Sequence, residues 1–326
     1  MTIPRIELAR LPTPLVPLDR VSSHIKGPRI WLKRDDLTDT TASGNKLRKL
    51  EFCVGRALEE DASVLITCGG IQSNHCRTTA VVAATLGLKC HLILRGKQKS
   101  PPDGNHLLDY LVGAKISWVG NKSYEELDDV YAQLEQDYRN AGDIPYSMPI
   151  GASDETGLWG YIEAARELKQ DFEQHGISPG YIVSAAGSGG TLGGLILGKK
   201  IHDLATNMVA FNVCDDEAWF VDKIRADMAR WENRYGQDFD MDTGALPITV
   251  IDGFVGPGYA RAEPQVFDTI KWLARTEGVI LDPVYTGKAF NAMLEEIGHG
   301  RFQDTEDIVF LHTGGIFGIF PQREQF

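Results

Sequence analysis

The chain has 326 residues, of which 43% are hydrophobic, enough for about two domains with a substantial buried core. Its formal net charge of −12 argues against a nucleic-acid or anionic-membrane surface as its main function, because such surfaces need a basic footprint. We therefore expect a globular protein that binds a small molecule, without nucleic-acid or membrane partners.

The first segment, MTIPRIELARLPTPLVPL, lacks the apolar core and cleavage site of a signal peptide. No run in the chain approaches the roughly 18 apolar residues that a membrane span needs. The five cysteines are scattered and form no C-x-x-C pair, which is typical of reduced thiols. A soluble cytoplasmic protein is expected.

Short apolar segments alternate with longer amphipathic ones, the pattern of strands and crossover helices in an α/β protein. In chain order, strands are predicted at 29–36, 63–70, 89–96, 115–120, 181–186, 208–213, 246–254, 279–287 and 307–315. Helices are predicted after the start signal at 43–45, and at 78–88, 106–114, 123–142, 161–174, 192–200, 264–278 and 288–298. No repeat or long linker divides the chain, so its two domains must be interleaved.

Four of the predicted strands run into polar, glycine-rich sequences: TCGGIQSNH, SAAGSGGTLGG, DPVYTG and HTGG. In open α/β sheets, ligands bind at the carboxyl ends of strands, where free backbone N–H groups meet helix N-termini. These four strand ends are the expected location of the chemistry.

The segment GSGGT (187–191) joins an apolar strand to a helix, and its glycines allow consecutive N–H groups to surround an anion such as phosphate. The alternative is a tight turn without a ligand. A dinucleotide fingerprint fails because Leu192 occupies its third glycine position, and a P-loop fails because Lys200 replaces the required Ser or Thr.

The segment TASGNKLRKLEF (41–52) has the small polar residues of a helix start but places three cations in the first turn. Cations are disfavoured there by the helix dipole. Lys46 avoids this cost if it binds an aldehyde as an imine, and Lys49 avoids it if it faces an anion. A cofactor with one aldehyde and one phosphate would satisfy both; the alternative is three solvated cations on a surface helix.

Several motifs together resemble the D-cysteine desulfhydrase and 1-aminocyclopropane-1-carboxylate deaminase family of pyridoxal-phosphate enzymes, of the tryptophan-synthase β-like fold (fold type II). The motifs are KRDDLTDTTASGNKLRKLEF, GGIQSNHCR, AAGSGGTLGGL, GVILDPVYTGKAF and FLHTGG, and the resemblance runs from about residue 11 to 320. It implies two open, twisted, mostly parallel sheets flanked by helices. It also implies a large domain of residues 1–52 and 161–326, a small inserted domain of residues 53–160 that contributes the loop for the substrate carboxylate, and a homodimer.

The resemblance implies pyridoxal 5′-phosphate as the cofactor, without a metal, and assigns roles to specific residues. Lys46 corresponds to the lysine that binds the cofactor as a Schiff base, and Lys49 to a phosphate contact, together with the backbone of Ser188, Gly189, Gly190 and Thr191.

The remaining implied roles concern the ring and the substrate. Asn74 matches an asparagine beside the cofactor 3-hydroxyl, and Ser73, Asn74 and His75 match the loop that receives the substrate carboxylate. Tyr285 matches a tyrosine beside the ring, and Thr313 a hydroxyl near the pyridine nitrogen.

Three positions, occupied by His75, Thr286 and Thr313, fit the desulfhydrase side of the family, because the deaminases carry Gln, Glu and Leu there. Other positions depart from the family pattern, namely Cys68, Cys76, Asp154, Glu155 and Trp159. Asp154 and Glu155 are interpreted as a charge pair at a helix start, or else as pocket residues that would change the substrate.

The resemblance implies α,β-elimination on a small amino acid, with D-cysteine converted to pyruvate, sulfide and ammonia. Lys46 is the preferred base for the α-proton, with Ser73 and Tyr285 as rivals, and Tyr285 either protonates the leaving sulfur or shapes the pocket. The alternatives are a 1-aminocyclopropane-1-carboxylate deaminase, a lyase for L-cysteate or another β-substituted amino acid, and an inactive binding protein. Arg48 is assigned to a surface or interdomain ion pair.

Overall fold

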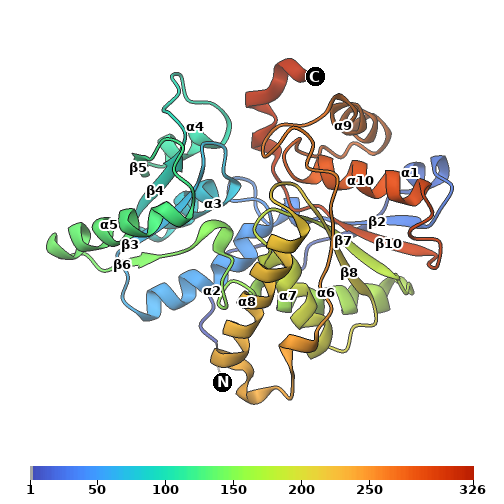
Figure 1. Cartoon of the computed structure of the whole chain (residues 1–326), viewed down its shortest axis with the longest axis horizontal. Coiled ribbons are helices and arrows are strands. Elements are labelled where there is room, and N and C mark those ends of the chain that lie inside the picture. The colour runs from blue at the N-terminus through green and yellow to red at the C-terminus, as the bar shows by residue number, and fades with distance from the viewer. Residues whose placement is uncertain (1–2) are drawn as a thin grey trace.

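The computed structural model describes residues 3–326, which form two separate sheets with helices on both faces of each (Figure 1). The six-stranded sheet has the order β1-β2-β10-β7-β8-β9, and all its strands are parallel except β1. The four-stranded sheet has the order β5-β4-β3-β6 and is entirely parallel. The predicted fold class is confirmed.

The strands are β1 (Leu15–Pro17), β2 (Arg29–Lys33), β3 (Val64–Gly70), β4 (Lys89–Arg95), β5 (Lys115–Trp118), β6 (Pro145–Ser147), β7 (Tyr181–Ala186), β8 (Asn207–Asn212), β9 (Thr249–Ile251) and β10 (Asp307–Leu311). The helices are α1 (Asp19–His24), α2 (Asn45–Glu59), α3 (Asn74–Leu86), α4 (Gly104–Leu111), α5 (Asp128–Asn140), α6 (Trp159–His175), α7 (Gly190–Ile201), α8 (Glu217–Tyr235), α9 (Pro264–Glu277) and α10 (Thr286–Gly298). No helix within residues 3–326 is both long and apolar enough to cross a membrane.

Alternate side chains of the six-stranded sheet point to opposite faces and pack into two hydrophobic cores. One core packs β-strand residues such as Ile182 and Val309 against α6, α7 and α8. The other packs Val183 and Phe310 against α1, α9 and α10. Because both faces are buried, these strands read as nearly continuous apolar runs, which explains why the sequence reveals them.

The four-stranded sheet is covered by α2 and α3 on one face and by α5 on the other. Its strands lie between Val64 and Ser147, whereas the larger sheet takes strands from both sides of that segment. Figure 1 shows α2 between the two sheets. Helix α2 runs without a break through position 52, so the domain limits of 52 and 160 stay a prediction.

The strand predicted at 279–287 is wrong. Val279 and Leu281 are buried, but the segment pairs with no strand and turns into α10. The Asp282 carboxylate accepts hydrogen bonds from the backbone N–H groups of Val284, Tyr285 and Thr286, and Pro283 has no N–H to offer a ladder. Helix capping therefore outcompetes strand pairing here.

Other elements escaped prediction: β1, α1, the short β6 and the long helix α8. Helix α8 carries many charges, yet Phe220, Ile224, Met228, Trp231 and Tyr235 form one buried stripe at helical spacing. This helical periodicity of apolar residues could have predicted α8 from the sequence. The strand predicted at 246–254 is confined to Thr249–Ile251.

The N-terminal end of α2 is fixed by a buried ion network around Arg48, which is 1% exposed. Its guanidinium donates to Asp35 at 2.8 and 2.9 Å and to Glu167 at 2.9 Å. Burial raises the pKa of Glu167, but hydrogen bonds from Arg48 and the charge of Lys33 outweigh it and lower that pKa to about 2. The predicted surface or interdomain pair is wrong, because both carboxylates lie within the predicted large domain and the pair is buried.

Replacing Arg48 by Met should destabilise the protein by about 3–5 kcal/mol, because it leaves two buried carboxylates without their partner. The control is Arg56→Met on the same helix, where the pair with Glu60 is solvent-exposed and should contribute at most about 0.5 kcal/mol. Urea unfolding followed by circular dichroism measures both. Equal losses in the two variants would contradict a structural role for the Arg48 network.

Candidate active site

A cavity of about 650 Å³ lies where strands of both sheets end. It is lined by the carboxyl ends of β3, β4 and β7 and by the segments that follow β8 and β10. Of the predicted site residues, those that line it are Lys46, Ser73, Asn74, His75, Ser188, Gly189, Thr191, Tyr285 and Thr313.

Lys46 belongs to the first turn of α2 and faces this cavity. Its Nζ donates to the Asn45 side chain at 3.1 Å. Burial lowers the pKa of Lys46 to about 8, and the nearby charge of Arg77 acts in the same direction. Near neutral pH a larger fraction of this side chain is therefore a neutral amine than for an ordinary lysine, which suits a nucleophile or a base.

The start of α2 is held against the end of β10. Gly44 has φ of 110°, and a Cβ there would lie 2.7 Å from the carbonyl oxygen of Thr313. The Asn45 N–H donates to the same carbonyl at 3.1 Å. Only glycine fits this approach, which explains the glycine before the lysine.

Lys49 lies one layer below the cavity and does not line it. It is fully buried, and its Nζ donates to the Gly151 carbonyl and to Ser153 Oγ, both at 3.2 Å. A Cβ on Gly190 would lie 2.7 Å from this Nζ, so the lysine supports the glycine loop from beneath. Burial, and next the charge of Lys46, lower the pKa of Lys49 well below its usual value.

The loop 187–191 leads into α7, whose N-cap, Gly189, has φ of 81° and no side-chain cap. The first N–H groups of a helix have no partner within it, so this start can bind an anion. Ser188 Oγ is 2.8 Å from Ser153 Oγ, and Thr191 Oγ1 accepts from Asn45 Nδ2 at 3.0 Å. Gly190 itself does not line the cavity.

Helix α3 begins at the opposite wall. Ser73 is its N-cap, and its Oγ accepts from the Cys76 N–H at 3.1 Å. His75 is buried with Nε2 2.8 Å from Thr67 Oγ1, and no partner of its Nδ1 is found among the described residues. Burial, and next the charge of Lys46, lower the pKa of His75 well below its usual value, so the ring is neutral.

Tyr285 precedes α10, and its hydroxyl contacts that of Tyr259. Burial raises the pKa of Tyr285 well above its usual value, and the neighbouring Tyr259 adds to the shift, so the phenol keeps its proton. Thr313, 9% exposed, follows β10 on the wall beside Gly44. Residues from all four glycine-rich segments predicted from the sequence thus line one cavity.

Sequence analysis missed several residues at this site: Asn45, Arg95, Ser153, Lys223 and Tyr259. Arg95 ends β4 and is paired in register with Gly70, a signal that the strand prediction offered. Tyr259 comes from an irregular loop, so no periodicity pointed to it. The expectation of three solvated cations on α2 is wrong, since Arg48 and Lys49 are buried.

Most of the positions that depart from the family pattern have structural roles. Asp154 accepts hydrogen bonds from the Thr156 and Gly157 N–H groups, and Glu155 pairs with Arg234 at 3.1 Å. Trp159 and Cys68 belong to hydrophobic cores. None of these four lines the cavity, so the interpretation of Asp154 and Glu155 as residues at a helix start is favoured.

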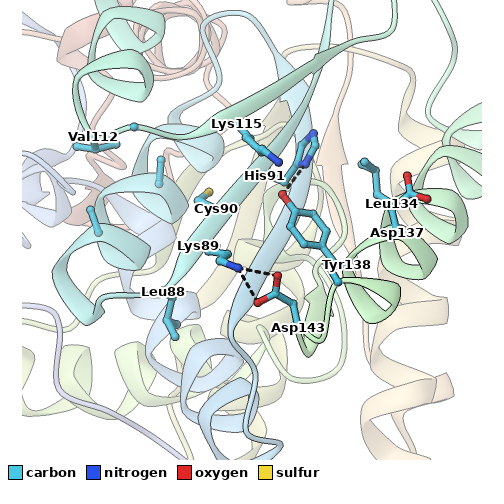
Figure 2. Close-up of a pocket in the computed structure, with 14 residues that line it drawn as sticks. Leu88, Lys89, Cys90, His91, Val112, Lys115, Leu134, Asp137, Tyr138 and Asp143 are labelled. Carbon is cyan, nitrogen blue, oxygen red and sulfur yellow. Dashed lines mark hydrogen bonds and ion pairs between the residues drawn. The ribbon is translucent and has the colours of Figure 1, made fainter.

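A larger cavity, of about 740 Å³, lies at the amino ends of β4 and β5. Figure 2 shows two pairs among its polar groups: Lys89 bonds Asp143, and His91 bonds the Tyr138 hydroxyl at 3.0 Å. Lys115 Nζ stands 5.5 Å from the Tyr138 ring centre. With no helix start or glycine loop among its lining residues, it lacks the features of the first cavity.

Comparison with known proteins agrees with this geometry. A family model described as "Pyridoxal-phosphate dependent enzyme" matches residues 6–314. The chain is 37% identical to the mitochondrial bifunctional D-cysteine desulfhydrase/1-aminocyclopropane-1-carboxylate deaminase of Arabidopsis thaliana, covering 98% of this chain and 80% of that one. It is 38% identical to the D-cysteine desulfhydrase of Klebsiella pneumoniae, covering 97% and 95%. The crystal structure of an ACC deaminase homologue superposes with a TM-score of 0.90 at 34% identity, covering 99% and 95%.

The lowered pKa of Lys46 predicts that its acylation has a lower pH midpoint than that of an ordinary lysine. Amine-reactive reagents attack only neutral amines, so Lys46 should react half-maximally near pH 8, against about 10.4 for an ordinary lysine. Peptide mass spectrometry of pulse-labelled, cofactor-free protein measures this, with the exposed Lys97 as an internal control. A midpoint for Lys46 equal to that of Lys97 would contradict the electrostatics described above.

Proposed function

Because the chain belongs to the family of pyridoxal-phosphate dependent enzymes, we propose that it carries out α,β-elimination on D-cysteine, giving pyruvate, sulfide and ammonia. It is a lyase with pyridoxal 5′-phosphate as its cofactor. D-cysteine is the substrate named for the two curated relatives above, and 1-aminocyclopropane-1-carboxylate is named for one of them.

The cavity fits this cofactor. The uncapped start of α7, with Lys49 buried beneath it, provides a cradle for a phosphate. The Lys46 amine, with its lowered pKa, lines the same cavity and would hold the aldehyde end. We assign the phosphate to the backbone of Ser188, Gly189, Gly190 and Thr191 supported by Lys49, and the ring to Asn74, Tyr285 and Thr313.

When bound, pyridoxal phosphate supplies a reactive aldehyde carbon and a pyridine ring that withdraws electrons from the substrate α-carbon. The protein must then orient the substrate and move protons. The N-terminus of α3 would bind the substrate carboxylate, because its first N–H groups and dipole favour an anion. Ser73, Asn74 and His75 lie at that point.

Lys46 is the best candidate for the base that removes the α-proton. Its pKa of about 8 lies near working pH, where a base is most effective. The Ser73 hydroxyl, by contrast, accepts the helix-capping hydrogen bond from Cys76 N–H. Tyr285, protonated and hydrogen-bonded to Tyr259, would be able to donate a hydrogen bond to the leaving sulfur.

Thr286 is the observation that favours desulfhydration over cyclopropane ring opening. It is fully buried, and its hydroxyl donates to the Asp282 carboxylate at 2.7 Å, so it presents no acid to the cavity. The carboxylates that line the cavity, Asp128 and Asp215, are exposed. A thiolate can leave without the additional proton transfer that ring opening requires.

Arg95 favours a second candidate substrate, L-cysteate or another amino acid with an anionic β-substituent. Its guanidinium lines the cavity and lies 4.6 Å from the centre of the Tyr124 ring. Its Nε is buried and has no hydrogen-bond partner among the described residues. A sulfonate oxygen would satisfy that donor.

We further propose that the protein is a cytoplasmic homodimer, as the family resemblance implies. Light scattering of the purified protein during size-exclusion chromatography tests the dimer. A monomeric mass would overturn this part of the proposal.

Replacement of the two lysines should separate chemistry from cofactor retention. Lys46→Ala should lower turnover by at least about 100-fold and abolish the borohydride-reducible visible absorption, because it removes both the amine and the base. Lys49→Ala should weaken cofactor binding by about 10- to 100-fold and keep turnover at saturating cofactor. Lys200→Ala, at the exposed end of α7, is the control. Normal turnover in Lys46→Ala would refute the mechanism.

A substrate panel tests the reaction itself. D-cysteine should give the highest kcat/KM, measured as pyruvate and sulfide release, against L-cysteate, 1-aminocyclopropane-1-carboxylate and D-serine. The Arg95→Leu variant should lose activity toward L-cysteate in particular, if the second candidate holds. No turnover of any compound by cofactor-loaded protein would favour an inactive binding protein.

A further inference from the structure

Arg77, the fourth residue of α3, is fully buried, and all its hydrogen-bond partners among the described residues are neutral groups. Its Nη1 donates to the Thr41 carbonyl at 2.7 Å, and both Nη1 and Nη2 donate to the Ser43 carbonyl at 3.0 Å. Its Nε donates to Asn105 Oδ1 at 3.1 Å. Arg77 therefore joins the segment before Lys46 to α4.

Asn105 continues this chain of hydrogen bonds. It is fully buried, and its Nδ2 donates to Asn74 Oδ1 and to the Gln72 carbonyl, both at 2.9 Å. Its backbone N–H donates to Gln72 Oε1 at 2.9 Å. The side chain thus makes contacts in both directions, toward Arg77 and toward the loop that starts α3.

The orientation of both amides follows from the chemistry of arginine. A guanidinium has donors and no acceptor, so Asn105 must turn its Oδ1 toward Arg77 and its Nδ2 toward Asn74. Amide orientations are assigned from such networks, and here one end of the network is unambiguous. Asn74 must then use its Oδ1 to accept, which leaves its Nδ2 to face the cavity that it lines.

We infer that Arg77 and Asn105 are positioning residues that fix the amide polarity of Asn74, so that an N–H donor faces the ring oxygen of the bound cofactor. This inference rests on the proposed function, since it takes Asn74 to be the residue beside that oxygen. We call the chain of hydrogen bonds from Arg77 through Asn105 to Asn74 the relay. It acts on the cofactor through Asn74, because neither Arg77 nor Asn105 lines the cavity.

The relay has an electronic consequence. An N–H donor stabilises a phenolate oxygen and holds the pKa of the cofactor chromophore down, whereas a carbonyl oxygen in its place would repel that charge. Burial and the charge of Arg77 also lower the pKa of Lys46, so both effects favour the deprotonated forms of the reacting groups.

Asn105→Asp reverses the relay with almost no change in shape. The carboxylate still accepts from Arg77 but can no longer donate, so Asn74 must turn its Nδ2 toward Asp and its Oδ1 toward the cavity. The pH midpoint of the visible absorption band of the bound cofactor should then rise by about one unit or more. The matched control is Asn140→Asp on exposed α5, which should leave the midpoint unchanged.

The experiment is a pH titration of the visible spectrum of the cofactor-loaded enzyme, with the unfolding temperature measured alongside. In the Asn74→Ala background, Asn105→Asp should no longer shift the midpoint, because the relay has lost its last member. Arg77→Lys, which can also only donate, should keep the wild-type midpoint, and it tests the relay even if Asn105→Asp fails to fold.

An unshifted midpoint in folded Asn105→Asp, or an equal shift with and without Asn74, would overturn the relay and leave Arg77 and Asn105 as packing residues. A shift in Arg77→Lys as large as that expected for Asn105→Asp would overturn it too. If wild-type protein loaded with pyridoxal phosphate shows no pH-dependent visible band, the proposed function fails instead.

Discussion

The buried pairing of Arg48 with Asp35 and Glu167 is the constraint on which the site depends. Arg48 lies between Lys46 and Lys49 on α2, so the ion network that fixes its guanidinium also fixes the rotation of the helix about its axis. With Arg48 turned toward Asp35 and Glu167, Lys46 faces the cavity and Lys49 lies under the glycine loop. Such a network adds little net stability compared with an apolar core, but it tolerates only one arrangement, which is what the proposed role of Lys46 requires.

This arrangement resolves the electrostatic conflict in the first turn of α2. Three cations at a helix N-terminus are unfavourable if all are solvated and charged. Here Arg48 is neutralised by two carboxylates, Lys46 has its pKa lowered by burial, and Lys49 lies against the carbonyl of Gly151. The sequence pattern is thus incompatible with a plain surface helix and compatible with a binding site.

The sheets and the ligand-facing loops were predictable because their signals are local. Buried parallel strands such as 63–70 read as apolar runs, and the glycine loop at 187–191 follows one of them directly. The false strand at 279–287 arose because an apolar run cannot reveal that Asp282 caps the next helix. Contacts set by tertiary structure, such as Ser153 beneath the glycine loop or Tyr259 beside Tyr285, produce no periodic pattern in the sequence. The charges of Lys46 and Lys49 and the glycine loop indicated an anion site from the sequence, whereas the roles of the other site residues rested on the family resemblance. Supporting contacts, such as that between Arg77 and Asn105, follow only from the structure.

Three basic residues at or behind the cavity share a feature that favours an anionic ligand. Lys46, Lys49 and Arg77 bond amide, hydroxyl and carbonyl oxygens rather than carboxylates. Burying cations without counter-ions is costly, and the lowered pKa values of all three express that cost. A ligand with anionic oxygens in the proposed cofactor site would offset that cost, and its binding would stabilise the folded protein by mass action. The positive charge that is costly to bury therefore also favours an anion in the proposed cofactor site.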